Sequence, residues 1–130
     1  MADGVVFGKV SGAGAVGIGY KVTASGNRSI SIGNDNGNTQ TEASGEKAIA
    51  IGSGVQSKGS AAIAMGKNTY ALKDESVAIG SSVSAVGSAT GSTVIGSNST
   101  TNAERSVSLG SSISTSAAAT YSTGIGYQVN

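Results

Sequence analysis

The sequence predicts an all-β fold of the solenoid class, in which short coils stack into a rod. Three observations predict it: a five-residue phrase recurs at a fixed spacing, the phrase alternates small and large apolar residues, and no helical periodicity is present. Alternation with a period of two is typical of a strand with one buried face. Serine, glycine and β-branched residues dominate the chain, and these residues disfavour helices.

The recurring phrase is clearest in the stretch from residue 43 to residue 80. It occurs there as AIAIG (48–52), AIAMG (62–66) and SVAIG (76–80), so the closing glycines are evenly spaced, fourteen positions apart. Further copies end at Gly19, Gly33, Gly96, Gly110 and Gly126, and residues 5–8 are interpreted as a degenerate first copy. The spacing of the closing glycines defines the repeat unit, with longer steps where a turn is extended.

A second, weaker phrase follows each glycine and predicts a second short strand in every unit. An apolar or hydroxyl residue stands three positions after the glycine and a small residue two positions later, as in Val55/Ser57 and Val83/Ala85. A unit with two strands and two turns makes one flattened coil of a β-solenoid. About eight coils at the ~4.8 Å strand spacing give a rod roughly 40 Å long. The polar excess Asn34–Asn38 is expected to bulge outward from a turn, and the charged residues are expected to gather along one edge.

The alternation within the first strand predicts which side chains face inward. We expect the large residues to fill the coil, because nothing else in the phrase can do so. The predicted roll core is Ile30, Ile32, Ile49, Ile51, Ile63, Met65, Val77, Ile79, Ile95, Val107 and Leu109. The predicted turn glycines are Gly33, Gly52, Gly66, Gly80, Gly96 and Gly110.

The small residues of the phrase would then form the outward face of the first strand. That row is Ser31, Ala50, Ala64, Ala78, Val94 and Ser108. Small, uncharged rows let backbones approach closely, so we interpret the row as the candidate interface of a trimer, the simplest closed arrangement of rods. A solvated smooth face is the alternative interpretation, and the residues alone weigh the two about evenly.

Composition argues against several classes of function. The formal net charge is +1 and lysine and arginine are scattered, so we expect no nucleic-acid binding. The chain has no cysteine for disulfides or thiolate sites and no histidine, the commonest catalytic base and metal ligand. No apolar run approaches the ~18 residues of a membrane span, so no membrane contact is expected. Seven acidic residues scattered over turns lack the cleft that carboxylate catalysis needs, and we predict no enzyme activity.

Three short motifs match functional patterns only in form. Gly12–Gly17 spells a dinucleotide fingerprint, but it is followed by another copy of the strand phrase and not by a helix. Ser44 and Lys47 have the spacing of a serine nucleophile and its lysine, yet they fall in a turn. Asn34–Gly37 resembles the start of a calcium loop without its later glutamate. We therefore predict no cofactor and no metal.

Phrases such as SVAIGSSV (76–83) and AIAIG (48–52), recurring every fourteen positions, resemble the head repeats of YadA-like trimeric autotransporter adhesins. The resemblance covers residues 13 to 127. It implies a left-handed parallel β-roll, a homotrimer, display on the bacterial cell surface, and adhesion to host extracellular matrix, with collagen as a family ligand. We interpret residues 1–12 as a leading segment with the degenerate first coil and residues 13–130 as head repeats.

The sequence departs from the family pattern where Thr93 and Thr123 replace the first large residue and Gly17 and Gly124 replace the middle small one, so we expect the end coils to pack less well. It shows no signal peptide, coiled-coil stalk or membrane anchor, so we interpret it as a head segment of a longer protein anchored in the outer membrane. The leading hypothesis is an adhesin head. The alternative is a structural or receptor-binding segment of a trimeric phage or bacteriocin tail fibre. Binding to ice is disfavoured because the threonines are irregularly placed.

Overall fold

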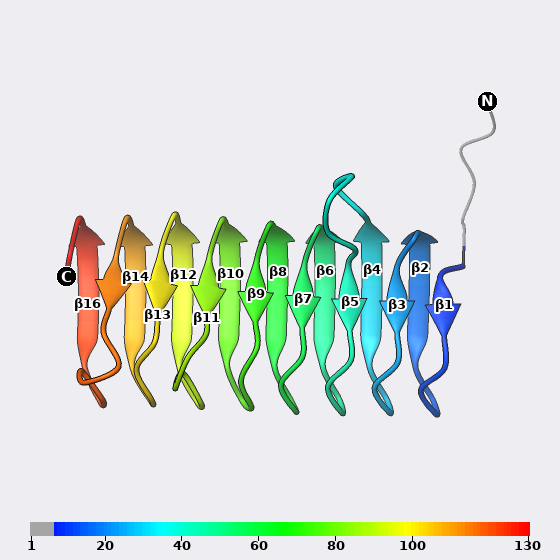
Figure 1. Ribbon diagram of the computed structural model, residues 1–130, viewed down its shortest axis with the longest axis horizontal. Coiled ribbons are helices and arrows are strands. Elements are labelled where there is room, and N and C mark those ends of the chain that lie inside the picture. Colours follow the sequence, from blue (N-terminus) through cyan, green and yellow to red (C-terminus); the bar gives the residue numbers. More distant parts are fainter. Residues whose placement is uncertain (1–6) are drawn as a thin grey trace.

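Two parallel β-sheets run along the whole stack of coils in the computed structural model, which describes residues 7–130 (Figure 1). Each complete coil gives five residues to a long-stranded sheet and two residues to a short-stranded sheet. The long strands are β2 (Val16–Tyr20), β4 (Ile30–Asn34), β6 (Ile49–Ser53), β8 (Ile63–Lys67), β10 (Val77–Ser81), β12 (Thr93–Ser97), β14 (Val107–Ser111) and β16 (Thr123–Tyr127). The short strands are β1 (Lys9–Val10), β3 (Thr23–Ala24), β5 (Glu42–Ala43), β7 (Gln56–Ser57), β9 (Tyr70–Ala71), β11 (Ser84–Ala85), β13 (Thr100–Thr101) and β15 (Ser114–Thr115).

The register of the long sheet follows the sequence repeat residue by residue. Ile49 pairs with Ile63, and Ile63 pairs with Val77 in the next coil. The predicted β-solenoid, with one sequence repeat in each coil, is therefore confirmed. Of the predicted degenerate first copy, Val5 and Val6 lie outside the described residues, and Phe7 makes an isolated antiparallel bridge to Ile18.

The closing glycines of the phrase form a column along the long sheet. They occupy the fourth position of each long strand, so the strand continues for one residue beyond them. From Gly33 to Gly110 their φ angles lie between 128° and 145°, a region that residues with a Cβ rarely adopt. A Cβ built on Gly80 would lie 2.8 Å from the carbonyl carbon of Gly96 in the next coil. Glycine is thus required both by backbone conformation and by the close stacking of coils.

The structure reverses the sidedness predicted for the long strands. The six small residues predicted to form an interface are all buried inside the single chain at 0% exposure: Ser31, Ala50, Ala64, Ala78, Val94 and Ser108. The eleven large residues predicted as roll core instead face outward, half-buried or exposed: Ile30, Ile32, Ile49, Ile51, Ile63, Met65, Val77, Ile79, Ile95, Val107 and Leu109. Both predictions of sidedness were wrong.

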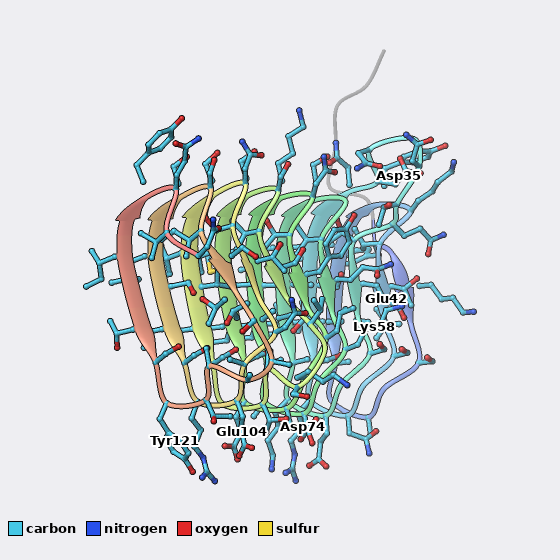
Figure 2. The ribbon with its side chains drawn as sticks, turned by 60° about the vertical axis from the view of Figure 1, so that its left-hand side comes forward. Asp35, Glu42, Lys58, Asp74, Glu104 and Tyr121 are labelled. Carbon is cyan, nitrogen blue, oxygen red and sulfur yellow. The ribbon has the colours of Figure 1, made fainter. Side chains whose placement is uncertain are left out.

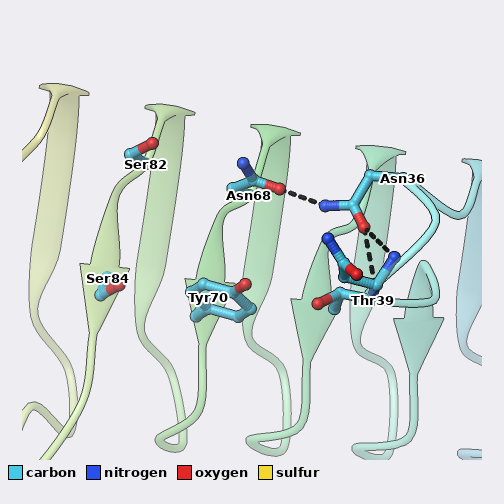
Figure 3. A pocket seen from close by; sticks show the side chains of 7 residues that line it. Asn36, Thr39, Asn68, Tyr70, Ser82 and Ser84 are labelled. Atoms are coloured by element: carbon cyan, nitrogen blue, oxygen red, sulfur yellow. Dashed lines mark hydrogen bonds between the residues drawn. The ribbon is translucent and has the colours of Figure 1, made fainter.

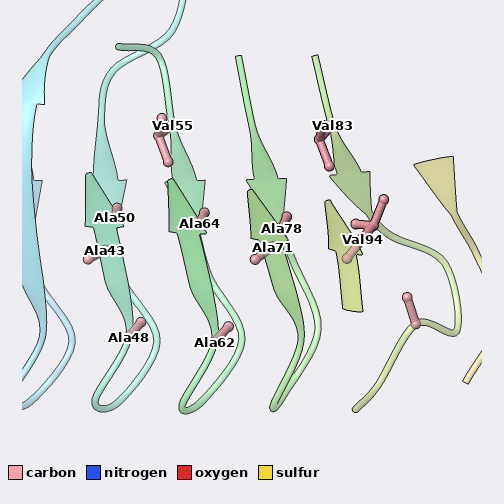
Figure 4. Packing of buried hydrophobic residues seen from close by; sticks show 12 residues of the cluster. Ala43, Ala48, Ala50, Val55, Ala62, Ala64, Ala71, Ala78, Val83 and Val94 are labelled. Carbon is pink, nitrogen blue, oxygen red and sulfur yellow. The ribbon is translucent and has the colours of Figure 1, made fainter. Parts of the chain in front are cut away.

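The reason for the reversal lies in the short strands, whose inward side chains the prediction left out. Val55, Val83 and Ile113 precede short strands and are at most 1% exposed, and Ala71 and Ala85 end short strands at 0% exposure. These residues fill the space between the sheets, which leaves room opposite them only for alanine, serine or valine. Figure 4 shows the resulting interior of small side chains.

Most buried hydroxyls of this interior find hydrogen-bond partners within the coils, the exceptions being those of Ser29 and Ser122. The Ser31 hydroxyl donates to the carbonyl of Thr41 at 3.1 Å, and the Ser57 hydroxyl donates to the carbonyl of Ala62 at 2.9 Å. The hydroxyls of Ser108 and Thr115 lie 2.8 Å apart. Because these groups are paired, serine and threonine can replace alanine and valine in the core.

Insertions lengthen the turns and leave the strands in register. The five-residue excess lies between β4 and β5, where the chain forms a protruding loop, as predicted (Figure 1). The two longer steps that end at Gly96 and Gly126 have their extra residues at 86–92 and 116–122, after a short strand. A solenoid accepts such changes because each coil contacts only its neighbours.

Candidate functional site

The outward face of the long sheet carries two columns of large apolar side chains, at the first and third positions of the strands. The first column runs Val16, Ile30, Ile49, Ile63, Val77, Thr93, Val107 and Thr123, and the second runs Ile18, Ile32, Ile51, Met65, Ile79, Ile95, Leu109 and Ile125. Within the long strands the only charged residue is Lys67, at the end of β8. Apart from Thr93 and Thr123 the columns are apolar, and together they form an apolar surface along the rod.

These side chains shield one another only along the stack. In the middle of the stack Ile49 and Ile63 are half-buried by the coils on either side, whereas Val16 and Ile125 near the ends are 43% and 66% exposed. Nothing within the described chain covers this face. We refer to the two columns together as the apolar face.

The outward face of the short sheet is polar by contrast. One row of side chains runs along it: Lys9, Thr23, Glu42, Gln56, Tyr70, Ser84, Thr100 and Ser114. Glu42 forms an ion pair with Lys58, 3.4 Å between Oε2 and Nζ. We call this set of residues the polar row.

Charged residues occupy both edges of the coils, which corrects the prediction that they gather on one. Asp74 and Glu104 extend from the turns that precede long strands, while Asp35 lies at the opposite edge (Figure 2). There Asp35 pairs with Lys21, 3.3 Å between Oδ2 and Nζ. The hydrogen bond and charge of Asp35 raise the pKa of Lys21 above its ordinary value. Dispersed pairs of this kind do not create a field of one sign.

The described residues offer little for catalysis or metal binding. Residues 7–130 contain no group of three or more acidic, histidine or cysteine side chains placed to hold a metal ion. They also contain no helix with the length and hydropathy of a membrane span. The dinucleotide-like motif Gly12–Gly17 runs into strand β2 and not into a helix, and Ser44 and Lys47 lie in the turn before β6. Most of the charged side chains of the described residues sit in turns.

Sequence reasoning missed one further feature, an open cleft of about 330 Å³ beside the protruding loop. It is formed where the loop meets the polar row near Tyr70. A sequence signal was present, because Gly54 stands at a turn position where most coils carry a side chain, one coil after the five-residue excess.

Comparison of the sequence with protein-family models identifies the kind of repeat that builds this solenoid. The profile described as the YadA head domain repeat matches residues 11–36, 39–54, 57–82 and 88–112, which is well over half of the chain. The chain belongs to the YadA head domain repeat family. No individual curated protein is significantly similar to it.

Membership of the YadA head family implies cell adhesion of the trimeric autotransporter type, at the cell surface, by proteins anchored in the outer membrane. The family and its solenoid are non-enzymatic in kind. It also implies homotrimer assembly and binding of host ligands in general. The match favours the adhesin hypothesis over the tail-fibre alternative.

Proposed function

We propose that this YadA-type head binds host extracellular matrix or cell-surface ligands, as a homotrimer whose three chains pack through their apolar faces. The single observation that carries the proposal is the apolar face itself, with Ile49, Ile63 and Val77 at its centre. Monomeric proteins rarely leave such a large contiguous apolar patch in water.

Burial of the apolar face supplies the driving force for assembly. Removal of apolar area from water contributes about 25 cal/mol per Å². Six of the eight long strands present two apolar positions in the same register, and β12 and β16 present one beside a threonine, so three identical rods can meet along their whole length. Three such faces around one axis close the assembly and leave no apolar face exposed. The polar row and the turns then remain outside, where they can contact ligands.

The interface is tested by placing a charge on each face. We expect Ile63→Glu, on the apolar face, to yield a folded monomer because three carboxylates would meet near the axis. Gln56→Glu, on the polar row, is the matched control and should still form trimers. Sedimentation velocity measures the mass against the 12.5 kDa of one chain, and circular dichroism reports the β content. A trimer of unchanged affinity in the Ile63→Glu variant would overturn the interface.

Ligand binding is tested with the assembled protein on immobilised matrix proteins, collagen among them. Many weak contacts repeated over three chains and several coils should give saturable binding through avidity. The Ile63→Glu monomer should therefore bind far more weakly than the Gln56→Glu trimer. Absence of saturable binding to every matrix protein and to host cells would refute the adhesive function.

A further inference from the structure

The protruding loop docks onto a gap in a column of turn side chains. Two residues after the closing glycine, most coils carry a side chain, as at Lys21, Asn68 and Ser82. Gly54 leaves that place empty, and the Asn36 side chain of the loop occupies it. A Cβ on Gly54 would lie 2.7 Å from Asn36 Cγ. Asn36 Nδ2 donates to Asn68 Oδ1 in the following coil (Figure 3).

The loop is also held in shape by its own hydrogen bonds. Asn36 Oδ1 accepts the backbone N–H groups of Asn38 and Thr39, at 2.9 Å and 2.7 Å. The hydroxyl of Thr41 donates to the carbonyl of Asn34 at 2.6 Å, and Asp35 pairs with Lys21. The loop therefore presents a preorganised surface, which lowers the entropic cost of binding.

Docking of the loop creates one wall of the open cleft. Asn36, Asn38 and Thr39 contribute this wall, and Asn68, Tyr70 and Ser84 are among the residues that line the other side (Figure 3). The cleft volume of about 330 Å³ lies at the lower end of the ~300–1,000 Å³ range of small-molecule sites. No charged side chain lines the cleft.

We propose that this cleft binds a neutral carbohydrate. Amide and hydroxyl side chains both donate and accept hydrogen bonds, which matches the hydroxyl groups of a sugar. Within residues 7–130, Asn68 Nδ2 and the Tyr70 hydroxyl have no partner in the protein, so they are available to a ligand. The Tyr70 ring offers an aromatic surface against which the apolar C–H side of a sugar ring packs.

Other ligand classes fit the lining less well. A sialylated or sulfated glycan would find no cation among the lining residues, and an apolar ligand would find only one ring. The short strands at the cleft are paired on both sides, so an extended peptide has no strand edge to join.

The position of the cleft is compatible with the proposed assembly. It lies on the polar row, away from the apolar face, and remains open when the apolar faces are buried. The family match pauses between residues 36 and 39, so the loop interrupts the common repeat. The inference rests on the proposed function only in assigning the sugar to a host glycan, because the cleft itself is formed within one chain.

The experiment uses the whole chain on an array of neutral oligosaccharides made of hexoses and N-acetylhexosamines, with sialylated and sulfated versions alongside. Binding to the neutral members is expected, and in solution the side-chain amide NMR signals of Asn36 and Asn68 should shift on addition of the bound sugar. Asn68→Gly and Tyr70→Ala should each weaken binding about tenfold through loss of hydrogen bonds and ring contact.

Matched controls separate the cleft from general effects of substitution. Asn98 occupies the same turn position two coils away with φ of 50°, against 51° for Asn68, so Asn98→Gly should leave affinity within about twofold. Tyr121→Ala, at the opposite edge, is the control for loss of a tyrosine. Gly54→Asn introduces a residue that tolerates the φ of 63° at this position, but its side chain would displace Asn36. This variant should also weaken binding.

Failure of this inference can be told from failure of the proposed function. If the assembled protein binds matrix proteins but no neutral glycan, or binds only acidic glycans, the carbohydrate site is overturned and the adhesive function stands. If the Asn98→Gly and Tyr121→Ala controls lose as much affinity as the cleft variants, the cleft is not the site. Glycan binding without any matrix or cell binding would support the cleft and refute the wider function.

Discussion

Replacement of Gly80 by alanine probes the requirement that holds the coils together. The new Cβ would overlap the carbonyl oxygen of Gly96 and would lie 2.8 Å from its carbonyl carbon and 3.1 Å from its nitrogen. Carbon atoms normally approach to about 3.5–4.0 Å, so β10 and β12 would have to separate by at least about 1 Å. Backbone hydrogen bonds between the same coils, such as Val77 N–H to the Ser92 carbonyl at 2.8 Å, would then exceed hydrogen-bonding distance.

The expected destabilisation follows from these two effects. A non-glycine residue at a φ of 140° costs about 1–3 kcal/mol, and two or three weakened hydrogen bonds cost about 1 kcal/mol each. We therefore expect Gly80→Ala to lower the free energy of unfolding by about 3–5 kcal/mol. Urea unfolding at a fixed protein concentration measures it, since association alters apparent stability.

Gly37→Ala is the control for this prediction. Gly37 also has a positive φ, of 90°, but a Cβ there would meet no atom within 4 Å. Only the conformational cost of about 1–2 kcal/mol should remain. Equal effects of the two substitutions would show that the close stacking of Gly80 on Gly96 does not govern stability.

Three further substitutions and one change of pH test other parts of the structure. The turn residues Ala61 and Gly91 both have a positive φ, of 54° and 65° respectively, which favours glycine. Ala61→Gly should therefore raise the free energy of unfolding by about 0.5–1 kcal/mol, and Gly91→Ala should lower it by a similar amount. The urea midpoints of the two variants should shift in opposite directions. Val83→Ala, at a fully buried site, should lower the melting temperature through a loss of about 2 kcal/mol; an unchanged thermal transition would contradict the tight interior. The hydrogen bond and charge of Asp35 raise the pKa of Lys21 above its ordinary value. The contribution of the lysine charge to loop stability is therefore complete at pH values below the ordinary lysine pKa, and it is lost as pH rises through the higher pKa of the folded state. The NMR signals of the loop should stay constant over about pH 6 to 9 and change only under strongly alkaline conditions.

The coil and its register could be predicted from sequence because they depend on spacing. Evenly spaced glycines place Ile49, Ile63 and Val77 above one another in any stack of equal coils, and the structure pairs them in that way. The outward bulge of Asn34–Asn38 followed from the same rule, since excess length in a solenoid can be accommodated only at a turn.

The sidedness of the strands could not be obtained from the long phrase alone. Alternation distinguishes two faces but does not say which one is buried, and hydrophobicity favoured the isoleucines. The inward side chains of the opposing strand, such as Val55 and Val83, decide the question by the space that they leave. Ala64 therefore lies in the core, and Ala64→Glu would bury a charge and prevent folding. If Ala64 lay at the trimer interface, the same substitution would block assembly but leave the single chain folded.

The cleft was missed because it depends on an exchange between distant residues. Nothing in the local sequence indicates that Asn36 will occupy the place left by Gly54, which belongs to the next coil. The exchange is encoded across neighbouring coils, in the side chains that stand at one turn position of each coil. The missing side chain at Gly54 and the five extra residues in the preceding coil belong to one contact, in which Asn36 fills the space beside Gly54.

The tolerance of the turns has a practical meaning for anyone who wishes to build on this scaffold. The loop between β4 and β5 adds five residues without shifting a single strand pair, and a turn between a long strand and the following short strand recurs in the coils from β2 to β14. Foreign peptides grafted at several of these turns would be displayed as an evenly spaced array, one coil apart, on a backbone that needs no redesign.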